Sequence, residues 1–168
     1  MARRMRNAVL TLGAILALGC SDPAMDSPLS SARKSPEALA EAALEALAMR
    51  DEAALAELMI TKDEYESLLW PLLPDREHMP FEFVWSLTGP GSRKARRNVL
   101  SEFGGLPLEL VRVDLGPEVE RYERFTLYRE ARMTVRRDDT GEEGLLPLMD
   151  VLVEMGGGWK FMNFRDDL

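Results

Sequence analysis

Arg129 is the residue whose type and position first suggest chemistry. Strict alternation along residues 121–136 puts its side chain on one face with apolar ones, namely Phe125, Leu127, Ala131 and Met133. A guanidinium there is costly unless it is paired, and a ligand carboxylate would be one partner. The alternative is a β-bulge between Tyr128 and Glu130 that turns Arg129 outward. We take Arg129, Trp85 and Tyr128 as the candidate ligand-binding residues.

The remaining candidates are weaker. Asp150 could act as a general base beside Tyr122 or Tyr128, although strand parity favours a solvated aspartate on the outer face of the sheet. The only histidine, His78, lies between prolines and is read as a surface residue. We find no phosphate-binding loop, metal-ligand motif or nucleophile motif, and therefore predict no catalytic residue, no metal and no cofactor.

Residues 93–97 form a basic cluster, Arg-Lys-Ala-Arg-Arg, in an acidic chain. Such a cluster could contact anionic headgroups or the acidic patch of a partner. The alternative is the solvated face of a helix.

The first twenty residues have the parts of a secretory signal peptide. Three arginines precede an uncharged run from Ala8 to Gly19, which is too short to span a bilayer. The lone cysteine, Cys20, follows directly. Ordinary secretion, with a cysteine there by chance, is the alternative to a modified cysteine.

Leu18-Gly19-Cys20 resembles the lipobox of bacterial lipoproteins, with Ala17 where that pattern has leucine. The resemblance implies that residues 1–19 are removed and that Cys20 is acylated, so that lipid holds the protein in the cell envelope. Several acyl chains anchor a protein firmly. Ser21 favours the outer membrane over the inner one by the sorting rule of enteric bacteria.

Charge and length restrict the function further. The chain has 168 residues, with 21 Lys and Arg against 29 Asp and Glu. Loss of residues 1–19 removes three arginines and no acid, which leaves a net charge of −11. That balance disfavours a nucleic-acid partner. One cysteine allows no internal disulfide, and the length suits a single domain.

The chain divides into a polar segment, a helical half and a strand half. Residues 20–34 are rich in Ser, Pro and Asp and are predicted to be a disordered tether to the domain at 35–168. Helices are predicted after Ser35-Pro36, after the Thr61–Glu64 capping box and after Pro80. Gly89-Pro90-Gly91 is predicted to separate that last helix from one that Ser92 caps and Gly104-Gly105 ends.

The second half alternates between apolar and polar residues, which predicts strands. The predicted strands are Leu108–Leu115, Arg121–Arg136, Leu145–Met155 and Trp159–Phe164, joined by short turns into an antiparallel meander. The expected fold is α+β, with N-terminal helices packed on a curved four-stranded sheet.

This layout resembles the cone-shaped domains of the nuclear transport factor 2 superfamily, which includes SnoaL-like cyclases and ketosteroid isomerases. The resemblance rests on the order of elements over Ser35–Arg165, on the opening helix and on the closing Gly158-Trp159-Lys160. The early strand pair of that superfamily is not evident, so a cystatin-like arrangement stays open. The resemblance implies a pocket between helices and sheet, but the fold hosts enzymes, binding modules and structural domains alike.

Leu146, Leu148 and Leu152 share one face of a strand that is apolar on both faces. If the helices cover only the other face, a second copy is the simplest cover, which predicts a homodimer. We therefore expect a non-enzymatic envelope lipoprotein that binds a small apolar or anionic ligand or another protein. An isomerase- or cyclase-type enzyme with a carboxylate base, or a purely structural protein, are the alternatives.

Overall fold

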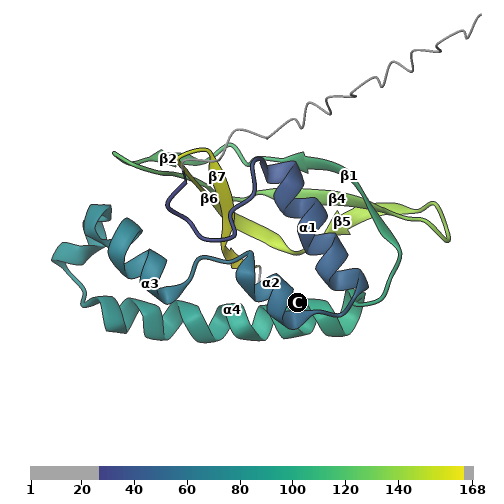
Figure 1. Cartoon of the computed structure of the whole chain (residues 1–168), viewed down its shortest axis with the longest axis horizontal. Coiled ribbons are helices and arrows are strands. Elements are labelled where there is room, and N and C mark those ends of the chain that lie inside the picture. The colour runs from purple at the N-terminus through teal and green to yellow at the C-terminus, as the bar shows by residue number, and fades with distance from the viewer. Residues whose placement is uncertain (1–26, 165–168) are drawn as a thin grey trace, which may run out of the picture.

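The computed structural model describes residues 27–164 and shows an α+β fold with the helices preceding the strands (Figure 1). The predicted signal peptide and Cys20 lie outside the described residues. The helices are α1 (Pro36–Ala48), α2 (Glu52–Glu57), α3 (Lys62–Glu64) and α4 (Phe81–Phe103), with the short turns η1 (Tyr65–Leu69), η2 (Trp70–Leu72) and η3 (Pro74–Glu77) before α4. The strands are β1 (Leu108–Asp114), β2 (Val119–Arg121), β3 (Thr126–Tyr128), β4 (Arg132–Arg137), β5 (Glu143–Leu146), β6 (Met149–Met155) and β7 (Gly158–Phe164).

Two predicted helix starts are confirmed in detail. The hydroxyl of Ser35 accepts a hydrogen bond from the amide of Ala38 at 3.1 Å, which caps α1. Thr61 and Glu64 form the predicted capping box, in which each side chain accepts from the other residue's amide, at 3.1 and 2.8 Å. Gly104 ends α4 as expected.

The predicted break at Gly89-Pro90-Gly91 is wrong, because α4 runs through it without interruption. Proline removes a backbone donor and glycine lowers helix propensity, so the local sequence opposes a helix. Tertiary packing of the residues before and after Gly89-Pro90-Gly91 nevertheless keeps the helix continuous. Trp85 lies against one core cluster before the break, while Ala95 and Val99 are buried in a second cluster after it.

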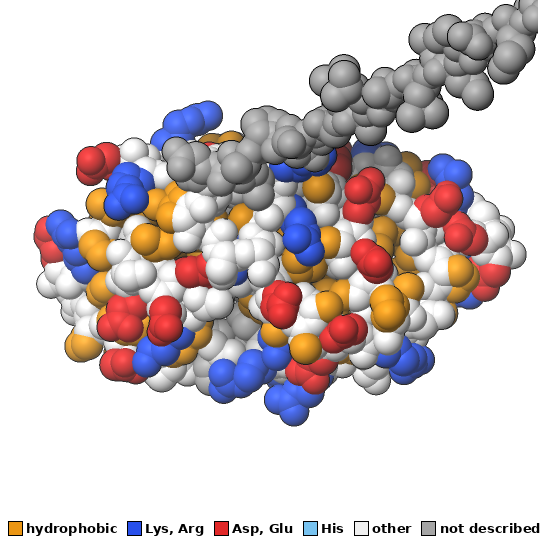
Figure 2. Space-filling model, in the orientation of Figure 1, with side chains coloured by type: hydrophobic (Ala, Val, Ile, Leu, Met, Phe, Trp, Pro, Cys, Tyr) orange, Lys and Arg blue, Asp and Glu red, His pale blue; other side chains and the backbone are white. Residues whose placement is uncertain are grey.

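Helix α4 lies along the lower edge of the molecule, parallel to its longest axis (Figure 1). The face seen in Figure 2 scatters acidic, basic and apolar side chains, but Lys and Arg side chains project from the lower edge, where α4 runs. One long helix therefore presents an inner face to the sheet and an outer face to the surroundings.

The sheet is more bent than the predicted meander. Strands β1-β4-β5 form one antiparallel sheet and β2-β3-β6-β7 another. The chain passes from one sheet to the other between β1 and β2, between β3 and β4, and between β5 and β6. Two of the four predicted strands, Arg121–Arg136 and Leu145–Met155, are therefore divided between the two sheets. The predicted bulge is confirmed by the register with β6. Tyr128 pairs with Leu152, but Ala131 rather than Glu130 donates to the carbonyl of Asp150, so one extra residue lies on this strand, and Glu130 has φ of +56°.

Strand β6 is buried on both of its faces. Leu152 pairs with Tyr128 and the adjacent Val153 pairs with Leu127, so Leu152 and Val153 point to opposite faces. One face belongs to a cluster that includes α1, and the other to a cluster with η1 and the start of α4.

This arrangement corrects the premise of the predicted dimer face. Leu146, Leu148 and Leu152 are buried within the chain itself, in the cluster that α1 covers. No second copy is needed to cover them, because helices pack against both faces of β6. A homodimer stays a prediction, but these leucines no longer support it.

The predicted tether is shorter than expected, because residues 27–34 pack on the domain. Arg33 and Trp159 exchange backbone hydrogen bonds of 3.0 and 2.7 Å, and Leu29 is 4% exposed. The hydroxyl and amide of Ser30 both donate to the carboxylate of Glu64 at 2.7 Å. Local composition did not reveal this segment, because its apolar side chains find cover only in the tertiary structure.

Candidate ligand-binding pocket

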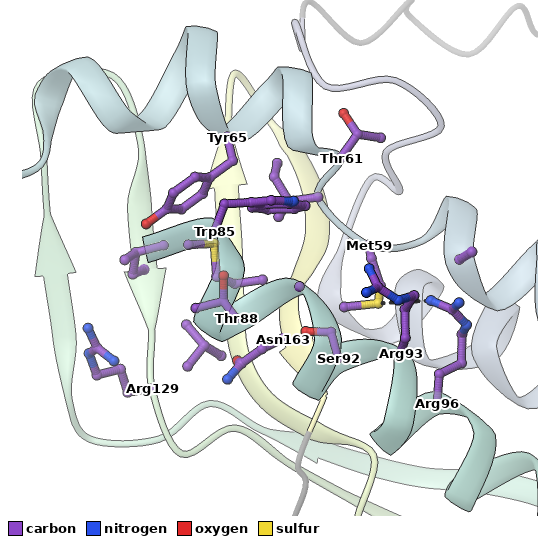
Figure 3. Close-up of a pocket in the computed structure, with 16 residues that line it drawn as sticks. Met59, Thr61, Tyr65, Trp85, Thr88, Ser92, Arg93, Arg96, Arg129 and Asn163 are labelled. Atoms are coloured by element: carbon purple, nitrogen blue, oxygen red, sulfur yellow. Dashed lines mark hydrogen bonds between the residues drawn. The ribbon is translucent and has the colours of Figure 1, made fainter. Parts of the chain in front are cut away.

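The principal candidate site is a cavity of about 270 Å³ between α4, the loop from α2 to α3, and the sheet of β3, β6 and β7 (Figure 3). The lining combines apolar and polar side chains. The apolar lining comes from Ala56, Met59, Ile60, Trp85, Leu127, Val151 and Met162.

Helix α4 contributes one stripe of the lining. Its members follow at helical spacing and are Trp85, Thr88, Gly89, Ser92, Arg93 and Arg96. Gly89 is central to this stripe, because a Cβ there would lie 3.3 Å from the indole of Trp85 and 3.7 Å from the guanidinium of Arg93. The absence of a side chain at Gly89 thus leaves room for both neighbours and for part of the cavity.

Among the described residues that line the pocket, every charged one is an arginine. Arg96 is 12% exposed and forms an ion pair with Glu52 of α2 at 3.2 Å. Its guanidinium also contacts the sulfur of Met59 at 3.8 Å. Arg93 is exposed and has no acidic partner among residues 27–164. In Figure 3, Arg93 and Arg96 lie on one side of Trp85, and Arg129 lies on the other.

Arg129 was expected either to face a ligand in the pocket or to be turned outward by a bulge, and it has features of both. The bulge leaves its side chain 41% exposed and ion-paired to Glu120, yet it lines the pocket. Hydrogen bonds from Arg129 and Tyr122 hold the pKa of the Glu120 carboxyl below its usual range. Burial and the bond to Glu120 raise the pKa of Tyr122 to about 12. The charge of Arg129 is therefore already balanced within the chain.

Asn163 is a further polar group at the pocket. Its side-chain amide nitrogen donates to Asp150 Oδ2 at 3.1 Å, while its Oδ1 is buried without a partner among the described residues. Among the described residues, Asp150 forms no hydrogen bond with Tyr122 or Tyr128. Tyr122 donates to Glu120, and the ring of Tyr128 packs on Trp159 with centroids 4.9 Å apart.

The sequence therefore located part of this site. Arg129 and Trp85 line the pocket, whereas Tyr128 does not. Arg93 and Arg96 were noted only as a basic cluster. A continuous α4 would have placed them on the same stripe as Trp85, but the predicted break at Gly89-Pro90-Gly91 hid that spacing. His78 is exposed, as predicted.

Comparisons with known proteins give no relative for this chain: no family model, curated protein or solved structure matches it. Across the part of the chain that the structure describes, no helix has the length and apolar character needed to cross a bilayer. Within residues 27–164, no three His, Cys, Asp or Glu side chains are grouped as they would be around a metal ion.

Proposed function

We propose that this domain binds a small amphipathic monoanion, such as a medium-chain carboxylate, without transforming it. The observation that carries the proposal is the charge of the pocket. Among the described residues that line it, the charged ones are Arg93, Arg96 and Arg129, and none is acidic. In a chain of net charge −8, such a cationic lining is unusual.

The pairing of these arginines points to a single negative charge on the ligand. Glu52 balances Arg96 and Glu120 balances Arg129, so among residues 27–164 Arg93 is the lining arginine without an acidic partner. A carboxylate bound between Arg93 and Arg96 would accept charge-assisted hydrogen bonds, which are about twice as strong as neutral ones. The apolar body of the ligand would then extend past Trp85 over Leu127 and Val151.

The lining also bears on the alternative of an isomerase-type enzyme. That chemistry uses a carboxylate base inside the cavity, and the described residues that line this cavity include no Asp, Glu or His. Asp150 does not line the cavity, and its carboxylate accepts a hydrogen bond from the lining residue Asn163. Binding alone fits the residues that are present.

We further propose that the protein resides in the cell envelope through acylation of Cys20, with the outer membrane favoured. The signal-like residues 1–19 and the lone cysteine support this location. Metabolic labelling with palmitate, compared between the natural chain and Cys20→Ser, tests it. Equal labelling of the two would contradict acylation at this residue.

Binding is best tested with a matched set of ten-carbon probes. Decanoate, decanol and decylammonium share ten carbons and a small head group and differ mainly in head-group charge, and titration calorimetry of the purified protein compares them directly. We expect decanoate to bind at least tenfold more tightly than decanol, because a hydrogen bond to a charged group contributes about 1.5–3 kcal/mol. The cation should not bind.

Two variants assign the effect to the pocket. Arg93→Gln should reduce the affinity for decanoate to that for decanol. Arg124→Gln removes the same charge from an exposed turn away from the pocket and should change the affinity less than twofold. Equal binding of decanoate and decanol by the natural protein, or equal losses in both variants, would refute the proposed anion site.

A further inference from the structure

The outer face of α4 carries a feature that the pocket does not use. We call Phe83, Leu87, Lys94, Arg97 and Ser101 the outer α4 stripe, because their spacing of three, four and seven residues places them along one side of the helix. Phe83 is 53% exposed and Leu87 is 64% exposed. Two large apolar side chains therefore project into solvent one turn apart.

The second half of the stripe carries two cations and one neutral polar residue, Ser101. Lys94 and Arg97 are exposed, and neither pairs with an acidic side chain among the described residues. The nearest acid at the start of α4, Glu82, lies off the stripe and is paired with Lys62 at 2.7 Å. In a chain with a net charge of −8, this outer face combines apolar and positive groups without an acid.

We propose that the outer α4 stripe is a docking surface for an anionic lipid bilayer. Helices that lie in a membrane interface insert Phe and Leu among the acyl chains while Lys and Arg contact anionic headgroups. The stripe has both parts in one line. It spans about 27 Å at 1.5 Å per residue.

The shape of the molecule favours a flat membrane over a protein groove. Helix α4 forms the lower edge of the molecule along its longest axis, and no other described helix or strand lies below it to keep the stripe from meeting a plane (Figures 1 and 2). A protein partner would more often bury aromatic anchors in a central pocket. Here the apolar residues lie at one end of the stripe and the cations in its second half.

A local fluorescence probe tests docking independently of any lipid on Cys20. The chain from residue 20 onward, without the signal-like residues 1–19, carries Cys20→Ser and Ser86→Cys, with an environment-sensitive nitrobenzoxadiazole label on Cys at position 86, beside Phe83 and Leu87. Vesicles of phosphatidylcholine with 30% phosphatidylglycerol should shift its emission to the blue. Pure phosphatidylcholine vesicles should not.

Each Lys or Arg near an anionic surface contributes about a factor of five to binding, so K94Q/R97Q should weaken vesicle binding about 25-fold. F83S/L87S should remove the blue shift. Arg124→Gln is the charge-matched control and should bind as the parent does. A label on Thr140→Cys, in the exposed turn after β4, should not respond.

Three results would overturn the proposal. One is an unchanged emission at position 86 with anionic vesicles. Another is an equal shift for the label at position 140, which would mean non-specific adsorption. The third is a shift that grows with protein concentration without vesicles, which would assign the stripe to contact with a second copy.

Discussion

Glu64→Gln should destabilise this protein more than any other single change in its charged groups. Lys160 is 0% exposed, and its ammonium contacts only the two carboxylate oxygens of Glu64, at 2.9 and 3.2 Å, among the described residues. The variant leaves that ammonium buried without a counter-charge. Removing one partner of a buried pair costs about 3–5 kcal/mol. Because domains are stable by about 5–15 kcal/mol, this loss is large.

Lys160→Met should cost less, and the difference is the sharper prediction. Glu64 keeps three other donors when the lysine is lost: the amide and hydroxyl of Ser30 and the amide of Thr61. We expect a loss of about 1–3 kcal/mol for Lys160→Met, as for a perturbed buried hydrogen-bond group. The double variant should be more stable than Glu64→Gln alone, because it removes the buried charge.

Urea unfolding followed by circular dichroism at pH 7 measures all three variants against the natural protein. The Glu64–Lys160 pair also predicts that the free energy of unfolding decreases at acid pH. Burial alone would raise the pKa of Glu64, but hydrogen bonds from Thr61, Lys160 and Ser30 outweigh it and the pKa is lowered. The stability from this group is thus present above its unfolded pKa of about 4.3 and is lost as the pH falls through the lower folded value. A cost below 1 kcal/mol for Glu64→Gln would refute the reasoning. So would the same loss of stability at acid pH in the natural protein and in Glu64→Gln.

Three further predictions follow from the packing. Gly89→Ala should change the unfolding free energy by no more than about 1 kcal/mol, because alanine favours a helix by about that amount while its Cβ crowds Trp85 at 3.3 Å. Calorimetry should nevertheless show weaker decanoate binding. Unchanged binding would mean that the ligand lies elsewhere. Leu29→Ala should destabilise the domain by about 2–5 kcal/mol in urea, because this side chain is buried, whereas a disordered tether would show no effect. Burial and Glu120 raise the pKa of Tyr122, so a pH titration followed by tyrosine absorbance at 295 nm should show one tyrosine that ionises near pH 12. This step should be absent from Tyr122→Phe. A normal titration of all tyrosines would count against that environment.

Short-range signals in the sequence predicted what neighbouring residues control. Ser35 and the Thr61–Glu64 box begin helices because their side chains satisfy amides only three residues away. The period-two pattern after Leu108 predicted strands for the same local reason. The bulge near Glu130 was also visible, since a charged residue interrupted the apolar face.

The site itself depended on contacts between distant residues. The break at Gly89-Pro90-Gly91 was a sound local prediction that packing on both flanks overrides. With that break assumed, nothing joined Arg93 and Arg96 to Trp85. The pairing of Arg96 with Glu52, 44 residues away, and of Arg129 with Glu120 likewise has no periodic signal.

The sequence by itself determined the class of fold, the order of helices before strands and the caps that start the helices. It also marked Arg129 as a residue that needs a partner. The tertiary structure decided which faces are covered, because burial depends on what packs there rather than on the pattern of one strand. It buried Leu148 and Leu152 inside the chain, docked residues 27–34 onto the sheet, and aligned the arginines of α4 with the pocket. Local propensity chooses elements, whereas long-range packing and charge pairing choose which of their side chains meet.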